Sequence, residues 1–240
     1  MFVKAIKIVN QAIFPIFRWE KISASEARIA VVGAGFFINS KGYFVSVIHI
    51  FDNPTTDTKF LYLGRLSDEI QNPQLEIREI TRDDEHDIFV GKLETKNRKY
   101  LYLADKIPHI GRSVCVSGYP LAHITRNTQG GLEVSGVRRY FQPSFVLDRA
   151  LLNSDNGAGK IRKHDGFLVR DVGLFGMSGG PVFDTKGVVV GVQGSVTQPR
   201  ISKNAAGRSI SVENAVAIRS NLILDLLKKS SIRANFLGKL

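Results

Sequence analysis

The sequence predicts an all-β protein built as barrels or sandwiches rather than from alternating strands and helices. Short runs rich in β-branched and aromatic residues recur along the chain, and glycine, proline and asparagine separate them. Only one long stretch, near the carboxyl end, repeats its apolar residues with helical spacing. The 240 residues suffice for one large all-β domain or two small ones with a substantial core.

The clearest strand pair is residues 30–38 and 43–48, which "NSKG" joins as a hairpin because Asn and Gly tolerate positive φ. Further short strand-like runs follow it: "KFLYLGRL", "QLEIREI", "DIFVGKLE", "SVCVSGYP", "LEVSGVRRYF", "GFLVRDV", "GPVFD" and "GVVVGVQGSV". A boundary between two β-rich halves is expected near "ADKIPHIGRS", residues 104–113.

The predicted helix is "NAVAIRSNLILDLLKKS", residues 214–230, where apolar residues recur every three or four positions. Residues 151–166, "LLNSDNGAGKIRKHDG", are polar and aperiodic, and we expect a loop there. The amino end, residues 1–21, is too short and too polar to span a bilayer. It is interpreted as part of the fold, with a peripheral membrane-facing helix as the alternative; no transmembrane span is predicted.

Composition is that of an ordinary globular protein, with 43% hydrophobic and 23% charged residues. The net charge of +11 raises the alternative of a nucleic-acid-binding β-barrel, but the basic residues are scattered, which favours a solvated basic surface. The single cysteine, Cys115, lies in a strand-like run and is predicted to be a buried structural thiol. One cysteine fits a reducing compartment, and no signal peptide is evident, so a cytoplasmic location is expected.

Three polar residues are candidates for a catalytic role. His49 ends a hydrophobic strand, Asp87 begins another, and Ser178 lies among the glycines of "FGMSGGPVFD". A serine becomes nucleophilic when a neighbouring base takes its proton and a third group orients that base. Each residue also has a plain structural interpretation, His49 as a hydrogen-bonded core histidine and Asp87 as a strand-edge residue.

The other histidines do not suggest a metal. His86 and Asp87 are sequence neighbours, whose side chains point to opposite faces of a strand, so they are not expected to pair. His109, His123 and His164 lie in segments predicted to be loops or turns, and no two histidines have the helical spacing of a zinc site. No metal or cofactor is predicted.

The order His…Asp…Gly-x-Ser-Gly-Gly-Pro resembles that of the trypsin-like serine proteases, and the resemblance covers most of residues 28–228. The matching segments are "GAGFFINSKGYFVSVIHIF", "DIFVGKL", "GRSVCVSGYP", "GFLVRDVGLFGMSGGPVFDTKGVVVGVQG" and "AVAIRSNLILDLL". The last is similar to the closing helix of HtrA-type proteases. The resemblance implies one peptidase domain over residues 1–240, all-β, with two six-stranded antiparallel barrels at 22–108 and 109–212 and a closing helix at 213–230.

The resemblance further implies a serine endopeptidase that forms an acyl-enzyme. Ser178 is the nucleophile, His49 the general base and Asp87 the orienting carboxylate, and the Gly176 and Ser178 amides form the oxyanion hole. Gly179, Gly180 and Pro181 set the turn that presents the hydroxyl. Met177 replaces the acidic residue of zymogen-activated digestive proteases, which argues for loop control instead, with residues 147–166 as a candidate regulator.

The substrate pocket is expected to be lined by Val172, Gly173, Gly194, Ser195 and Val196. These small or apolar residues indicate an aliphatic or small aromatic preference, whereas a register slip would bring Asp171 or Glu213 to the pocket floor. The partner is a protein or peptide substrate, and the chain after the helix is too short for the PDZ module common in HtrA-type proteases.

A catalytically inactive module that binds peptides or partner proteins is the alternative function. The bulky Val47, Ile48 and Phe89 motivate it, because crowding beside the presumed base would misplace His49 or Asp87. The sequence predicts no oligomeric state.

Overall fold

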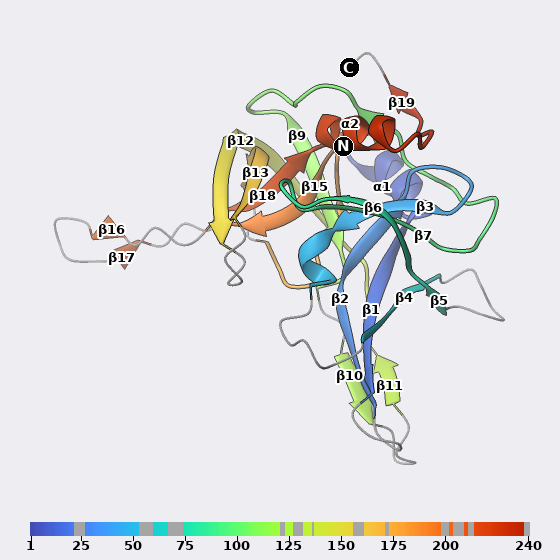
Figure 1. The fold of residues 1–240 in the computed structure, drawn as a ribbon. Helices are drawn as coiled ribbons and strands as arrows, with labels where there is room; N and C mark the ends of the chain where they lie inside the picture. The colour runs from blue at the N-terminus through green and yellow to red at the C-terminus, as the bar shows by residue number, and fades with distance from the viewer. Residues whose placement is uncertain are drawn as a thin grey trace.

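A computed structural model describes residues 1–21, 27–52, 60–66, 74–120, 123–126, 132–135, 137–155, 161–170, 173–197, 202–203, 209–210 and 214–237. Figure 1 shows a mostly β structure in which a first sheet, coloured blue to green, lies beside a second sheet coloured green to red. Two short hairpins extend from these sheets: β10 (His123–Arg126) with β11 (Leu132–Ser135), and β16 (Ser202–Lys203) with β17 (Ser209–Ile210).

The first sheet has the strand order β5-β4-β1-β2-β3-β7-β6 and is open among the described residues. Its strands are β1 (Ile13–Lys21), β2 (Ala27–Phe37), β3 (Tyr43–Val47), β4 (Phe60–Arg65), β5 (Gln74–Glu76), β6 (Arg78–Asp83) and β7 (Ile88–Lys92). The β2–β3 hairpin confirms the predicted pair, and Gly42 in its turn has a φ of 86°, a conformation that favours glycine. β1 extends this sheet to residues before the predicted start at 22.

The second sheet closes on itself. The ring runs β14-β9-β12-β13-β18-β15 and returns to β14, which makes a six-stranded antiparallel barrel, with β8 and β19 added in parallel beside β15. The strands are β8 (Leu103–Ala104), β9 (Ser113–Gly118), β12 (Tyr140–Asp155), β13 (Ile161–Val169), β14 (Pro181–Phe183), β15 (Val189–Val196), β18 (Ala215–Arg219) and β19 (Phe236–Leu237). The predicted all-β, two-barrel class is confirmed as one closed barrel and one half-barrel sheet.

The predicted helix at 214–230 is partly wrong. Residues Ala215–Arg219 form β18, which pairs with both β13 and β15 and closes the barrel. Helix α2 occupies Ser220–Lys229, and the Ser220 hydroxyl donates a hydrogen bond to the Ala104 carbonyl at 2.6 Å. The short apolar run at 215–219 fits the periodicity of a helix or of a strand. It forms a strand because β13 and β15 both pair with it.

The loop expected at 151–166 is also wrong for residues 151–155 and 161–166, which form strands, whereas residues 156–160 lie outside the described part of the chain. β12 and β13 form a long antiparallel hairpin in which Leu151 pairs with Asp165 and Asn153 with Lys163. The sequence shows no periodicity because the hairpin carries polar and apolar residues on both faces, with Leu151 and Ile161 exposed and Arg162 buried. The candidate regulator at 147–166 is therefore largely sheet.

Packing places the amino end inside the fold, as predicted. Helix α1 (Val3–Val9) buries Ala5 and Val9 against the core that runs between the two sheets. Cys115 is fully buried in the same core, which confirms the structural thiol. Within the described ranges, no helix is both long and apolar enough to cross a membrane.

Closure of the second barrel depends on a close approach at Gly166. A Cβ atom at this residue would lie 1.8 Å from the Ala217 carbonyl oxygen of β18. We therefore expect Gly166→Ala to force β13 and β18 apart and to destabilise the protein by about 1–3 kcal/mol. A thermal unfolding scan should show Tm lowered by several degrees.

The matched control is Leu151→Ala on the same hairpin, where the side chain is 75% exposed and Tm should stay nearly unchanged. Equal Tm values for the two variants would contradict the close packing of β13 against β18.

Candidate active site

Asp87 and His49 are joined at the end of the first sheet. His49 lies in the 3₁₀ turn η1 (Ile48–Ile50) that follows β3, and Asp87 immediately precedes β7, the pairing partner of β3. His49 Nδ1 is 2.7 Å from Asp87 Oδ2, and the His49 backbone N–H donates to Asp87 Oδ1 at 3.0 Å. The Asp87 side chain is 1% exposed and the His49 side chain 35%, so the carboxylate is covered and the ring reaches solvent.

This arrangement defines the tautomer of His49. An ionised carboxylate only accepts hydrogen bonds, so the ring proton lies on Nδ1 and Nε2 keeps its lone pair. Asp87 has a φ of 61°, an uncommon value for a residue other than glycine, and such strain gathers at functional sites. The imidazole is thus oriented with its basic nitrogen away from Asp87.

The turn that carries Ser178 belongs to the second barrel but packs against the first sheet. The Ala34 N–H of β2 donates to the Ser178 carbonyl at 2.9 Å, and a Cβ at Gly33 would lie 2.7 Å from that oxygen. Gly179 has a φ of 80°, and a Cβ there would lie 2.2 Å from Ser46 Oγ of β3. Glycine is required at both positions, and β3, which the turn contacts, leads directly into His49.

Two backbone amides of the Ser178 turn, those of Gly176 and Ser178, have no acceptor among the described residues. Gly176 has a φ of 89°, and neither its N–H nor that of Ser178 donates to any described acceptor. Neighbouring groups hold the turn: Gly179 N–H donates to the Gln193 carbonyl at 2.8 Å and Tyr119 N–H to the Gly176 carbonyl at 3.0 Å. Between the described atoms of Ser178 and His49 there is no hydrogen bond, a common feature of uncomplexed sites.

Of the residues expected to line the substrate pocket, the structure brings some together. A Cβ at Gly173 would lie 2.3 Å from Val196 Cγ1 and 3.1 Å from Gln193 Nε2. Gly194 lies at a β-bulge in β15, followed by the half-buried Ser195 and the exposed Val196. Val172, and the alternatives Asp171 and Glu213, lie outside the described residues.

Sequence reasoning missed Gln193, which is 2% exposed. Its Nε2 donates to the Ser195 carbonyl at 2.8 Å, and its Oε1 has no partner among the described atoms. The bulge at Gly194 interrupts the alternation of side chains along β15, which a strict period of two does not reveal.

Arg162 was also missed. Its guanidinium lies 3.1 Å from Asp87 Oδ1, although the two residues belong to different sheets. The only available signal was its place in the basic "GKIRKHDG" segment. His86, by contrast, pairs with Asp83 at 2.8 Å rather than with Asp87, as expected of sequence neighbours.

The bulky residues beside His49 do not displace it. Val47 and Ile48 are fully buried in the core, and Phe89 stacks on Phe51 with ring centroids 4.0 Å apart. The 2.7 Å contact of His49 with Asp87 forms despite them.

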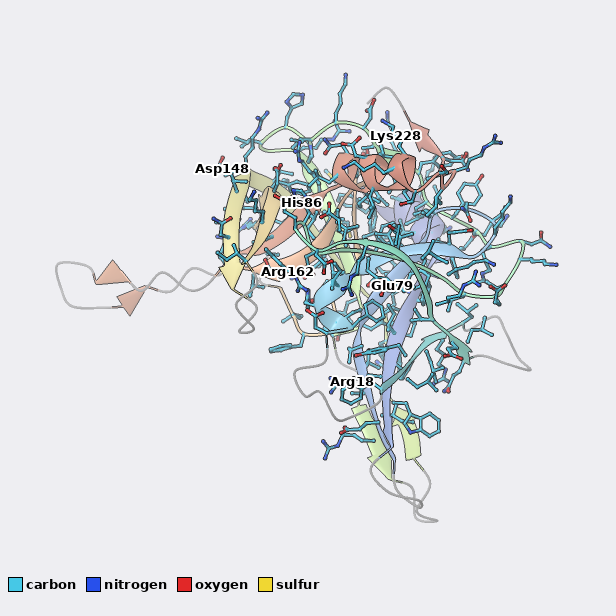
Figure 2. The ribbon with its side chains drawn as sticks, in the orientation of Figure 1. Arg18, Glu79, His86, Asp148, Arg162 and Lys228 are labelled. Carbon is cyan, nitrogen blue, oxygen red and sulfur yellow. The ribbon has the colours of Figure 1, made fainter. Side chains whose placement is uncertain are left out.

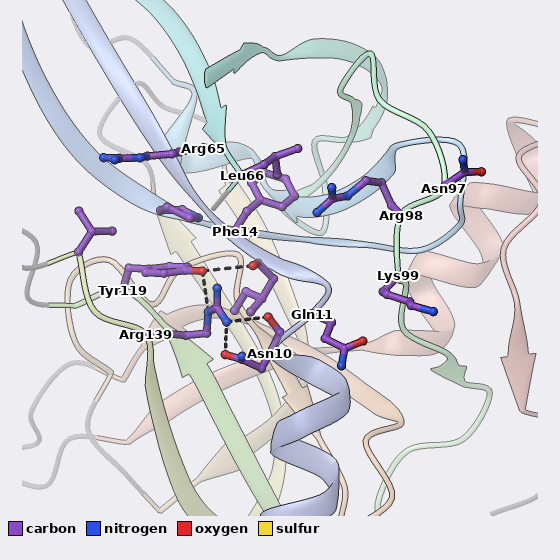
Figure 3. A pocket seen from close by; sticks show the side chains of 13 residues that line it. Asn10, Gln11, Phe14, Arg65, Leu66, Asn97, Arg98, Lys99, Tyr119 and Arg139 are labelled. Carbon is purple, nitrogen blue, oxygen red and sulfur yellow. Dashed lines mark hydrogen bonds between the residues drawn. The ribbon is translucent and has the colours of Figure 1, made fainter. Parts of the chain in front are cut away.

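A polar network around Tyr119 lines a cavity of about 800 Å³. It adjoins the Ser178 turn because the Tyr119 N–H donates to the Gly176 carbonyl. Figure 3 shows Arg139 contacting both the Tyr119 hydroxyl and Asn10. Arg139 Nε donates to that hydroxyl at 2.8 Å, and the hydroxyl donates to the Ile13 carbonyl at 3.2 Å. Burial raises the pKa of Tyr119, an effect that Arg139 partly offsets, so the phenol is neutral at physiological pH.

The chain is similar to known proteins in both sequence and fold. The family model described as a trypsin-like peptidase domain matches residues 33–192. Proteins named probable periplasmic serine endoprotease DegP-like match 215 residues, 88% of the chain, at 27% identity in Brucella suis and 29% in Bartonella henselae. The chain spans about a third of the length of these relatives, 36%.

Two solved structures share the fold. The Rv3671c protease of M. tuberculosis in its active form aligns with a TM-score of 0.66 and 17% identity, covering 98% of this chain and 87% of that one. An HtrA-type protease, an AlgW variant with a decapeptide, aligns with a TM-score of 0.65 and 14% identity over 95% and 66% of the chains.

The expected cytoplasmic location is overturned, because the curated relatives are named probable periplasmic endoproteases. A single thiol that is fully buried carries no information on redox compartment, since it cannot form a disulfide within the chain in either one.

The Tyr119 network predicts a stability difference. Tyr119→Phe removes a buried hydroxyl with two hydrogen bonds and should cost about 1–3 kcal/mol in urea denaturation. Because the folded pKa of Tyr119 is raised, this contribution is present below the unfolded value of about 10 and is lost as pH rises through the folded value. The loss should therefore be constant between about pH 6 and pH 9.

The control is Tyr140→Phe, because Tyr140 is 39% exposed. A Tyr119→Phe variant as stable as Tyr140→Phe would contradict a stabilising role of the Tyr119 network.

Proposed function

The chain belongs to the family of trypsin-like peptidase domains, and we propose that it is a serine endopeptidase with Ser178, His49 and Asp87 as its catalytic triad. Membership of the family confirms the resemblance found in the motifs, down to its HtrA-type relatives. The observation that carries the proposal is the buried Asp87 carboxylate bonded to His49 Nδ1 at 2.7 Å, with the Ser178 turn packed on the strand that leads to His49.

In the proposed first step the Ser178 hydroxyl attacks the carbonyl carbon of the scissile peptide. The Oγ–C bond forms while the hydroxyl proton passes to His49 Nε2, and the carbonyl π electrons move to the oxygen. Asp87 accepts the hydrogen bond of Nδ1 throughout and stabilises the imidazolium. The imidazolium then gives its proton to the amide nitrogen as the C–N bond breaks, which releases the amine and leaves an acyl-enzyme.

Hydrolysis of the acyl-enzyme repeats these steps with water. His49 Nε2 takes a proton from the water as its oxygen bonds to the ester carbon, and returns that proton to Ser178 Oγ as the ester bond breaks. In both halves the negative oxygen would accept hydrogen bonds from the Gly176 and Ser178 amides, which have no other described acceptor. One such donor is typically worth a factor of about 10²–10³ in turnover.

The substrates proposed are proteins or peptides. Gly173, Gly194, Ser195 and Val196 are proposed to line the pocket for the residue before the scissile bond, with an aliphatic or small aromatic preference, and the buried Gln193 adds an amide beside Gly173. Like its DegP-like relatives, the chain is proposed to act in the periplasm.

Active-site labelling tests the assignment. A fluorophosphonate should label the wild-type protein covalently, and Ser178→Ala should not be labelled, because the phosphorus bonds to the activated Oγ. Asp87→Asn should slow labelling by up to about 10⁴-fold by stabilising the wrong tautomer of His49. Mass spectrometry locates the adduct, and Ser144→Ala serves as the matched control.

Labelling that persists in Ser178→Ala would refute the nucleophile. A folded wild-type protein that neither labels nor cleaves, yet binds a peptide as well as Ser178→Ala does, would instead support the inactive binding module.

A further inference from the structure

Arg162 links the second barrel to the proposed triad. It is the second residue of β13, its side chain is 5% exposed, and Figure 2 shows it where the β12–β13 hairpin faces the first sheet. Nη1 lies 3.1 Å from Asp87 Oδ1 and Nη2 lies 2.5 Å from Asp52 Oδ2. Both carboxylates lie in turns at the end of the first sheet, Asp87 directly before β7 and Asp52 three residues after His49.

The ion pair with Arg162 offsets the cost of burying the Asp87 carboxylate. A carboxylate with 1% exposure is costly unless it is paired and its oxygens are hydrogen-bonded. His49 supplies two donors, and Arg162 supplies the positive charge. The planar guanidinium presents its two Nη groups to two acceptors at once, which a lysine ammonium on a flexible stem does not reproduce.

The hairpin holds Arg162 in place through its neighbour. Lys163 N–H donates to the Glu85 carbonyl at 2.7 Å, and Lys163 Nζ lies 2.6 Å from Glu85 Oε1. The hydrogen bond from Lys163 lowers the pKa of Glu85, as expected for a formed contact. Since Glu85 stands two residues before Asp87, the hairpin is fastened beside the carboxylate that Arg162 binds.

On these contacts, we propose that Arg162 is a positioning residue of the peptidase. It fixes the Asp87 carboxylate from the second barrel, with its other Nη group anchored on Asp52, so that the β12–β13 hairpin sets the orientation of the imidazole through Asp87. The inference rests on the proposed triad and adds to it a fourth residue, which acts through Asp87 and touches no substrate.

The test compares fluorophosphonate labelling rates in variants that retain their fold. Arg162→Met should lower the second-order rate constant by about 10- to 100-fold, the usual effect of a small misplacement of a reacting group. The matched control is Arg149→Met, which removes an exposed arginine of the same hairpin and should label at the wild-type rate.

A double-mutant cycle separates positioning from a general structural effect. If Arg162 acts through Asp87, adding Arg162→Met to Asp87→Asn should change the labelling rate less than about twofold. A second loss as large as the first would overturn the proposal, and so would a folded Arg162→Met with the wild-type rate. Should Arg162→Met not fold, Arg162→Lys carries the test with an expected loss of about three- to tenfold, because lysine does not span both carboxylates.

A spectroscopic readout keeps the inference independent of activity. The His49 Nδ1 proton in its bond to Asp87 should give a far-downfield proton NMR signal that is sharp in wild type and Arg149→Met and broadened or lost in Arg162→Met. A sharp, unshifted signal in Arg162→Met would overturn the role of Arg162. An unlabelled wild type would count against the proposed function, and the NMR comparison would then still decide the role of Arg162.

Discussion

A buried charge at the junction of the two sheets is the constraint on which the site depends. Asp87 is 1% exposed and bound by groups from both sheets, His49 from the first and Arg162 from the second. In a medium of low polarity its charge persists only with such partners. Docking of the barrel on the first sheet therefore completes the surroundings of Asp87 and the orientation of His49 in the same event.

The glycines around Ser178 allow the second barrel to pack closely against the first sheet. At Gly33 and Gly179 the two sheets approach so closely that a single added carbon would strike a backbone or side-chain oxygen. The turn thereby lies directly on β2 and β3, and the residues after β3 form the turn of His49. Backbone contact across the junction brings the serine and the histidine into one region, although their side chains share no hydrogen bond in this state.

The sequence predicted the features that depend on local pattern. The β2–β3 hairpin follows from its turn residues, and the motifs around His49, Asp87 and Ser178 indicated the family. Features that depend on tertiary pairing escaped prediction. Residues 151–155 and 161–166 look like parts of a loop because most of them pair with each other, and residues 215–219 look helical although they pair with two strands of the barrel. The role of Arg162 could not be predicted from its place in a basic segment, because its partners are 75 and 110 residues away.

In the proposed mechanism Ser178, His49 and Asp87 act on one reacting carbonyl. The most direct measurement is a crystal structure of the protein after reaction with a peptidyl phosphonate. We expect continuous density from Ser178 Oγ to phosphorus, a phosphoryl oxygen at the Gly176 and Ser178 amides, and His49 Nε2 within hydrogen-bonding reach of the adduct. An adduct on another residue, or an imidazole turned away from Ser178 in a fully reacted crystal, would contradict the proposed mechanism.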